Sequence, residues 1–173
     1  RAEGSSPPED RCDSVMAAVD EVLQRLPDLQ RRRVSLVLQG DDTATPVAHS
    51  MVVTALRNLL DNALRYAPDS PVVLHLRFDA RDRRVRIEVA DEGPGLTSDQ
   101  IAKAGKRFWR GDQGRGRGEG AGLGISIVRA IAQRHGGSLK LQANLEEEGA
   151  ITGLVAVLEF PIESPSARSR LEP

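Results

Sequence analysis

The longest periodic feature of the sequence is an apolar stripe over residues 49–66, and it limits the folds open to the chain. The apolar residues recur every three or four positions, which predicts an amphipathic helix. They are Val52, Val53, Leu56, Leu59, Leu60, Ala63 and Ala67. Pro68 and Asp69 end the helix. A helix with one apolar face has to bury that face against a second layer, which the rest of the chain must supply.

Alternating apolar and polar residues predict that second layer as a sheet. The expected strands cover residues 34–38, 72–78, 85–91, 138–143 and 151–160. Two further helical patterns cover residues 14–26 and 123–134. Helices and mostly antiparallel strands in this order predict an α+β fold, a two-layer α/β sandwich. Its mixed, mostly antiparallel sheet is covered on one face by helices.

The 173 residues are enough for one domain with a core of its own. We expect a disordered linker at residues 1–12, which are rich in Ser, Pro and Glu, a folded domain at 13–162, and a flexible tail at 163–173. Cys12 is the single cysteine, and one thiol cannot form an internal disulfide. A reducing, cytoplasmic location is therefore expected.

Charge and composition argue against several classes of partner. The chain has 24 Lys and Arg against 25 Asp and Glu, so no broad attraction to nucleic acid or to an anionic membrane is expected. Aromatic residues make up 3%, which disfavours a base-stacking surface. No apolar run approaches the roughly 20 residues that span a bilayer. We expect no nucleic-acid partner and no direct membrane contact by this chain.

Two asparagines lie on one face of the long helix, at the edge of its apolar stripe. Asn58 and Asn62 are four residues apart and so share a helix face, which Arg65 and Tyr66 continue one turn later. Asparagine is a poor helix former, so a pair of them costs stability unless it serves a purpose. A carboxamide oxygen is a good ligand for magnesium. The alternative is an ordinary solvated face of the helix.

A carboxylate ends one of the expected strands. Val85, Ile87 and Val89 face the core, and Asp91 has the same parity directly before the turn Glu92-Gly93-Pro94-Gly95. A carboxylate directed inward needs a fixed donor, because burying it unpaired is costly. The exocyclic amine of adenine would serve. The alternative is that amides of the turn satisfy it.

Glycines at every second position lead into the helix expected at 123–134. They are Gly118, Gly120, Gly122 and Gly124. Bare backbone amides at a helix N-terminus form an anion site that a phosphate can approach closely. Six basic residues precede them, namely Lys103, Lys106, Arg107, Arg110, Arg115 and Arg117. A flexible linker with solvated charges is the alternative, but a linker has no need of such spacing.

Other nucleotide and metal motifs are missing. No Gly-x-x-x-x-Gly-Lys-Ser/Thr run occurs, which excludes a P-loop. No Gly-x-Gly-x-x-Gly follows a strand in a parallel unit, which disfavours a dinucleotide fold. No Cys and His set has metal-binding spacing.

Together and in this order, these segments resemble the ATPase superfamily of gyrase, its heat-shock chaperone relatives, mismatch-repair ATPases and sensor histidine kinases. The segment 58–66 is similar to the N box, 91–95 to the first glycine box and 120–124 to the second. The segment 106–112, Lys-Arg-Phe-Trp-Arg-Gly-Asp, resembles the F box of histidine kinases. The resemblance covers about residues 14–161 and implies a long glycine-rich ATP lid at about 93–121.

The resemblance implies ATP and Mg²⁺ as ligands. At the catalytic centre, Asn62 would bind Mg²⁺, Asn58 would assist, and Arg110 would reach phosphate from the lid. Asn58 stands where gyrase-like members have a water-activating Glu, which favours phosphoryl transfer over hydrolysis. The other nucleotide contacts would come from Arg65, Tyr66, Asp91, Gly93, Gly95, Phe108, Gly120, Gly122, Leu123 and Gly124. Among them, Asp91 would accept from the adenine amine. The family often has a Gly-Thr pair near the last strand; this chain has Gly153-Leu154, and no nucleotide contact is assigned there.

The resemblance also implies an acceptor outside this chain. None of His49, His75 and His135 has the acidic neighbour and helical setting of the family's phosphoacceptor, so they are expected to be ordinary surface residues. The expected partners are the dimerisation and phosphoacceptor domain of a parent kinase, which is expected to be a membrane-anchored sensor, and the receiver domain of a response regulator. The isolated domain is expected to be a monomer. Two alternatives remain, a stand-alone serine kinase of the anti-sigma type and a non-catalytic ATP-sensing module.

Overall fold

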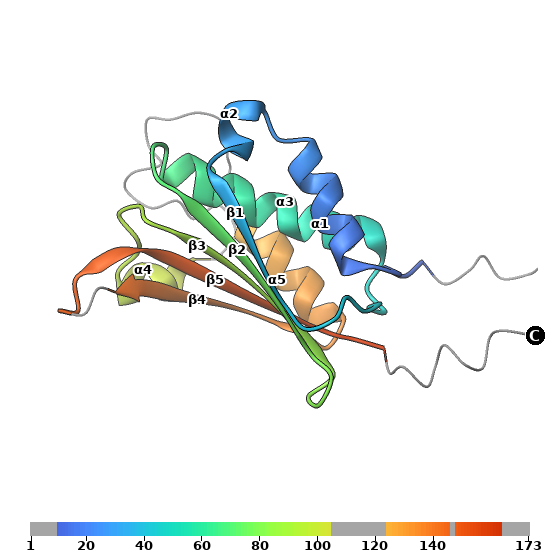
Figure 1. The fold of residues 1–173 in the computed structure, drawn as a ribbon. Coiled ribbons are helices and arrows are strands. Elements are labelled where there is room, and N and C mark those ends of the chain that lie inside the picture. Colours follow the sequence, from blue (N-terminus) through green and yellow to red (C-terminus); the bar gives the residue numbers. More distant parts are fainter. Residues whose placement is uncertain (1–9, 105–123, 146–147, 164–173) are drawn as a thin grey trace, which may run out of the picture.

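The computed structural model describes residues 10–104, 124–145 and 148–163, and its centre is a single five-stranded sheet. The strands are β1 (Val34–Gln39), β2 (Val72–Asp79), β3 (Arg84–Asp91), β4 (Ser138–Leu145) and β5 (Ile151–Pro161). Their order across the sheet is β1-β2-β3-β5-β4 (Figure 1). β1 and β2 are parallel and every other neighbouring pair is antiparallel. The sheet is therefore mixed and mostly antiparallel, as predicted.

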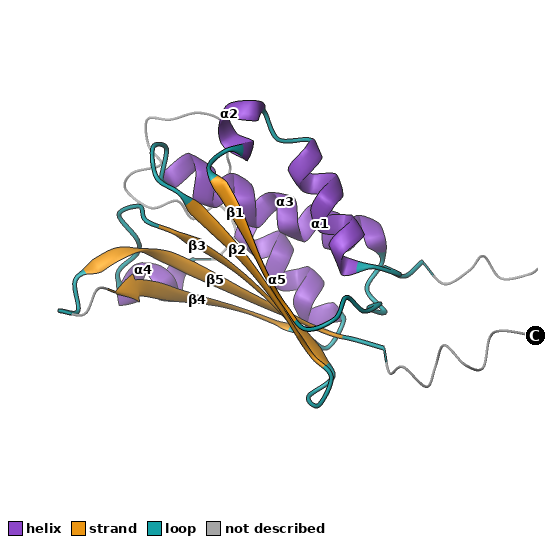
Figure 2. Ribbon diagram, in the orientation of Figure 1, coloured by secondary structure: helices purple, strands orange, loops and turns teal. Residues whose placement is uncertain are grey.

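Helices cover one face of this sheet (Figure 2). They are α1 (Val15–Gln24), α3 (His49–Tyr66) and α5 (Gly124–Arg134). The apolar stripe of α3 is buried, and Leu56, Leu59 and Leu60 are 0–2% exposed. Burying one such side chain contributes about 1.5–3 kcal/mol. The predicted two-layer α/β sandwich is confirmed.

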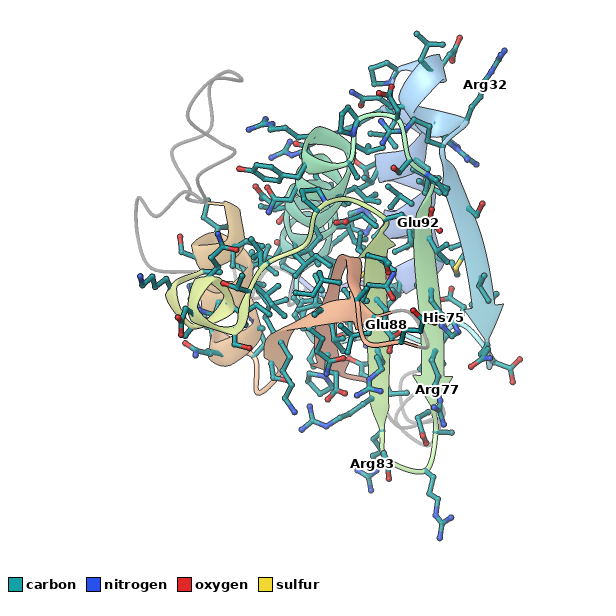
Figure 3. All side chains as sticks on the ribbon, turned by 90° about the vertical axis from the view of Figure 1, so that its left-hand side faces the viewer. Arg32, His75, Arg77, Arg83, Glu88 and Glu92 are labelled. Carbon is teal, nitrogen blue, oxygen red and sulfur yellow. The ribbon has the colours of Figure 1, made fainter. Side chains whose placement is uncertain are left out.

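The opposite face of the sheet carries charged and polar side chains together with valines such as Val37 and Val73. His75 and Arg77 on β2 alternate with the buried Leu74, Leu76 and Phe78, and lie with Glu88 of β3 away from the helices (Figure 3). On the same face the Nε atom of Arg86 lies 3.0 Å from Oε1 of Glu159 on β5. No helix in the described part of the chain is both long and apolar enough to cross a membrane.

Two short helices were not predicted from the sequence. α2 (Asp28–Arg31) follows Pro27, and α4 (Ser98–Lys103) lies inside the segment expected to be a loop. The side chain of Thr97 accepts from the amide of Gln100, whose side chain accepts in return from the amide of Thr97. This reciprocal capping starts a helix wherever Thr-x-x-Gln occurs in a compatible turn. Within the expected lid, residues 98–103 are therefore helical, while residues 93–97 before them form no helix or strand.

The ordered unit also reaches into the expected N-terminal linker. Cys12 is fully buried, and its backbone exchanges two hydrogen bonds with Thr45, of 3.2 and 2.9 Å. Burial raises the pKa of its thiol to about 11, so the thiol stays protonated at neutral pH. Its role in the fold is that of a small apolar side chain in the core.

Candidate nucleotide-binding site

The two asparagines of α3 lie at the rim of the core, both partly buried. The amide nitrogen of Asn58 donates to the carbonyl oxygen of Thr54 one turn earlier, at 2.8 Å. This bond fixes the carboxamide and directs its oxygen away from the helix backbone. Asn62 forms no side-chain hydrogen bond with any other described residue. Both carboxamide oxygens can therefore accept from, or coordinate, a bound group.

The first residue of α5 lies directly against Asn58. A Cβ placed on Gly124 would be 3.1 Å from Oδ1 of Asn58, closer than most side-chain contacts allow. The N-terminus of a helix carries a partial positive charge. The fold thus brings Gly124, the last of the alternating glycines, next to α3. The positively polarised N-terminus of α5 and the carboxamide of Asn58 therefore lie side by side.

Asp91 is the last residue of β3 and is 6% exposed, which confirms that it faces inward. Its Oδ1 accepts from the backbone amides of Gly93 at 3.0 Å and Leu154 at 3.2 Å. Its Oδ2 accepts from no other residue that the structure describes. The two amides therefore hold one carboxylate oxygen in place and leave the other for a ligand.

Burial raises the pKa of Asp91 above its ordinary value of 3.8, and the amides of Gly93 and Leu154 oppose that rise. A buried carboxylate with one unshared oxygen is suited to accept a hydrogen bond from a neutral donor. The amine of an adenine ring is such a donor. The turn-amide explanation of Asp91 therefore accounts for one of its oxygens only.

Gly93 and Gly95 hold the turn after Asp91 close to two other elements. A Cβ on Gly93 would lie 3.0 Å from both the Cβ of Ala67 and the carbonyl oxygen of Tyr66, at the end of α3. Gly95 has φ +66, and a Cβ there would lie 2.5 Å from the carbonyl oxygen of Gly153. The turn can follow this path at Gly95 only because that position lacks a side chain, and a side chain on Gly93 would require its neighbours to shift.

Sequence reasoning missed the residues of β5 and β4, the two strands next to β3 on one side, that hold Asp91 in place. Besides the amide of Leu154, the side chain of Asn144 on β4 donates to the carbonyl oxygen of Asp91 at 3.4 Å. A Cβ on Gly153 would lie 1.8 Å from that same oxygen, so no other residue fits there. The one available signal was the Gly153-Leu154 pair. The structure assigns it a contact with Asp91.

The remaining predicted site residues divide into two groups. Arg65 and Tyr66 are exposed at the C-terminal end of α3. Tyr66 is 38% exposed, and its carbonyl oxygen lies next to Gly93. Outside the described residues lie Phe108, Arg110, Gly120, Gly122 and Leu123, and with them residues 105–121 of the expected lid. Arg129 of α5 donates to the carbonyl oxygen of Ala104 at 2.9 Å, which ties the end of α4 to α5.

The three histidines lie outside this arrangement. His49 starts α3, where its Nε2 pairs with Glu21 of α1 at 2.7 Å. His75 lies on the polar face of the sheet, 3.9 Å from Glu88, and the Nδ1 atom of His135 pairs with the carbonyl oxygen of Ile131 at 2.8 Å. Each has a structural partner and none contacts Asn58, Asn62 or Asp91 in the structure.

The fold gives the class of this protein, a two-layer α/β domain with its helices on one face of a mixed sheet. Residues 49–164 match the family described as Histidine kinase-, DNA gyrase B-, and HSP90-like ATPase. The chain belongs to that family and is a catalytic domain of the histidine-kinase type.

The chain is 40% identical over 118 residues to the sensor protein QseC of Escherichia coli O157:H7, covering 68% of this chain and 24% of that protein. It is 36% identical over 107 residues to the signal transduction histidine-protein kinase BaeS of Escherichia coli K12, covering 61% of this chain and 22% of that protein. The chain therefore spans about a quarter of the length of these relatives.

Solved structures agree on the fold. The mycobacterial sensor histidine kinase MprB superposes with a TM-score of 0.70 at 23% identity, over 87% of this chain and 97% of that one. The histidine kinase domain of the Escherichia coli osmosensor EnvZ gives 0.65 at 24% identity, over 92% and 93%. At these identities the likeness concerns the fold alone.

Proposed function

We propose that this chain binds ATP with Mg²⁺ and transfers the γ-phosphoryl group to a histidine on a dimerisation domain outside the chain. The observation that carries the proposal is the double contact of α3. Its Asn58 meets the start of α5, while its end at Tyr66 and Ala67 meets the turn that follows Asp91. Eight residues of helix rise about 12 Å, comparable to an extended nucleoside triphosphate. One end suits phosphates and the other suits adenine.

The phosphate end fits a magnesium ion in its donor chemistry. No three His, Cys, Asp or Glu side chains in the described part of the chain lie close enough to hold a metal. Mg²⁺ commonly takes only one or two protein oxygens and fills its other positions with phosphate and water. Asn62 would supply the direct ligand and Asn58 would assist it. When bound, Mg²⁺ neutralises charge on the phosphates and orients them.

The protein residues then have three tasks in phosphoryl transfer. Asp91 fixes the adenine through Oδ2, while Gly93 and Gly95 leave room for the ring. Arg65 and the amides around Gly124 face the phosphates, and Tyr66 stacks near the base. Positioning and charge neutralisation supply most of the catalysis in such transfers.

Residues of the lid complete this proposal. Arg110 would neutralise charge on the transferred group, and Phe108 would anchor the lid. Gly120, Gly122 and Leu123 would line the triphosphate ahead of Gly124. Asn58 cannot abstract a proton, so the residue that activates water in gyrase-like ATPases is missing and a protein side chain is the favoured acceptor.

The proposal extends to the parent protein. Of the relatives named above, QseC is a sensor protein and BaeS a signal transduction histidine-protein kinase, and the chain matches about a quarter of each. We propose that the parent is a membrane-anchored sensor, that this domain lies in the cytoplasm, and that the phosphoryl group passes on to a response regulator. Apart from its parent, the domain acts as a monomer.

The test is Asn62→Ala with the parent's dimerisation domain supplied in trans. Phosphotransfer from labelled ATP is expected to be lost, while binding of adenosine is retained because Asp91 is intact. Ser50→Ala, an exposed position in the first turn of the same helix, is the control and keeps wild-type transfer. Circular dichroism checks the fold. Normal transfer by folded Asn62→Ala at millimolar Mg²⁺ would refute the central role of this residue.

A further inference from the structure

Arg33 connects the start of the sheet to the end of the asparagine helix. It is partly buried just before β1, and its guanidinium donates to three backbone carbonyl oxygens. They belong to Ser70 at 3.0 Å, Leu64 at 3.4 Å, and Ala67. Its own carbonyl oxygen accepts from the amide of Val72 at 2.9 Å. One residue thus fastens both ends of the connection from α3 to β2.

The end of α3 needs such a partner. The last carbonyls of a helix have no partner within the helix and carry a partial negative charge. Many helices solve this with a glycine in the left-handed conformation. Here the residue after the helix is Ala67, with φ −125 and ψ 66, which is not that conformation. A planar guanidinium with five N–H donors can bond several carbonyls at once and adds a positive charge.

The segment that Arg33 holds is the one against which the glycine turn packs. Gly93 fits against the Cβ of Ala67 and the carbonyl oxygen of Tyr66, and a Cβ on it would lie 3.0 Å from each. The amide of Gly93 in turn donates to Oδ1 of Asp91 at 3.0 Å. A displacement of Ala67 therefore reaches Asp91 through a single intervening residue.

We propose that Arg33 is a positioning residue for the adenine end of the site. It sets the path of residues 66–70 and, through Gly93, the orientation of the Asp91 carboxylate. It contacts no nucleotide itself. The inference rests on the proposed binding of ATP and adds to it a residue outside the four sequence boxes, 58 residues before Asp91 along the chain.

The test compares Arg33→Gln with Arg32→Gln. Arg32 is the neighbouring exposed arginine and makes no side-chain bond to the described residues (Figure 3). In Arg33→Gln, affinities for adenosine and ATP should fall by the same factor, about tenfold, as for losing a hydrogen bond that a charged group makes. In phosphotransfer, KM for ATP should rise by about that factor while kcat stays within about twofold, because the phosphate end is untouched. Arg32→Gln should match wild type.

Two further measurements separate positioning from a general loss of stability. Binding is measured at a temperature where circular dichroism shows each variant fully folded, and the Gly93 amide resonance is followed by NMR. That resonance should shift in Arg33→Gln and not in Arg32→Gln. If Arg33→Gln does not fold, Arg33→Lys, which keeps the charge but not the fork of donors, should fold and give an intermediate loss of adenosine affinity.

Unchanged adenosine affinity in a folded Arg33 variant would overturn the proposal, as would a loss confined to kcat. Wild-type protein that binds no ATP would instead overturn the proposed function. The two failures are therefore distinguishable within one set of titrations.

Discussion

Replacing Asp91 by Asn tests how the structure divides the two carboxylate oxygens between fold and ligand. Oδ1 accepts the amides of Gly93 and Leu154, and the oxygen of an Asn can accept both in the same place. The atom that changes is Oδ2, which becomes an NH₂ group. In the proposed complex this donor faces the adenine amine, so a hydrogen bond to a charged acceptor is lost. Such a bond contributes about 1.5–3 kcal/mol, which predicts about 10- to 150-fold weaker ATP binding.

The stability of the same variant should not fall. Because burial raises the pKa of Asp91 in the fold, its ionised form at pH 7 is less favourable there than in the unfolded chain. A neutral Asn removes that cost and keeps both amide bonds. Urea unfolding of Asp91→Asn should therefore give a free energy of unfolding equal to or above that of wild type. The variant loses function without losing stability.

Asp79 provides a matched control at the end of β2. Its Oδ1 also accepts two backbone amides, those of Arg81 and Asp82, each at 3.0 Å. Here the pKa of the carboxyl is lowered, mainly by the hydrogen bond from the amide of Asp82. The resulting stability is present above the unfolded pKa of 3.8 and is lost as pH falls through the lower folded value. Asp79→Asn should reduce stability at pH 7 and leave ATP binding unchanged.

Calorimetric titration with ATP and GTP, together with urea unfolding, measures both effects. GTP should bind wild type poorly, because its ring presents a carbonyl where adenine presents an amine. Unchanged ATP affinity in Asp91→Asn, or equal affinities of wild type for ATP and GTP, would refute the adenine contact. A large loss of stability in Asp91→Asn would show that the main role of the carboxylate is to stabilise the fold.

Three further outcomes are expected. Gly153→Ala should destabilise the domain by about 3 kcal/mol in urea unfolding, because the new Cβ would meet the carbonyl oxygen of Asp91. The control is Gly149→Ala, whose Cβ would have no described atom within 4 Å and which should cost about 1 kcal/mol because of the positive φ. ATP affinity should fall as pH is lowered through the raised pKa of Asp91. The contribution of this carboxyl to stability has the opposite pH dependence, since it is present at low pH and lost as pH rises through that pKa. An ATP affinity that stays constant down to the pH of acid unfolding would contradict this role. Arg129→Ala should free the end of α4 from α5 and increase amide hydrogen exchange at Ala104, with little effect on adenosine binding; unchanged exchange would show that the bond contributes nothing to holding α4.

Local sequence patterns predicted the five strands, the three long helices and the inward position of Asp91. The stripe of residues 49–66 predicted α3 with the bounds that the structure has, because apolar spacing is a local property that burial enforces. The parity of β3 placed Asp91 inward for the same reason. Local patterns failed where the signal was short. The four-residue α2 carries no period, and α4 depended on the capping pair of Thr97 and Gln100.

Which distant groups contact Asp91 and the end of α3 depends on how the helices and strands pack together. The amide of Leu154 lies 63 residues from Asp91 along the chain, and Asn144 reaches the same residue from another strand. Arg33 meets Leu64 and Ala67 because β1 runs parallel to β2 beside the helix end. Each of these contacts has a backbone amide or carbonyl on one side, and because nearly every residue carries these groups, no residue type marks that side of the contact in the sequence. Strand register and chain crossing select them, and both are set when the helices and the sheet pack together.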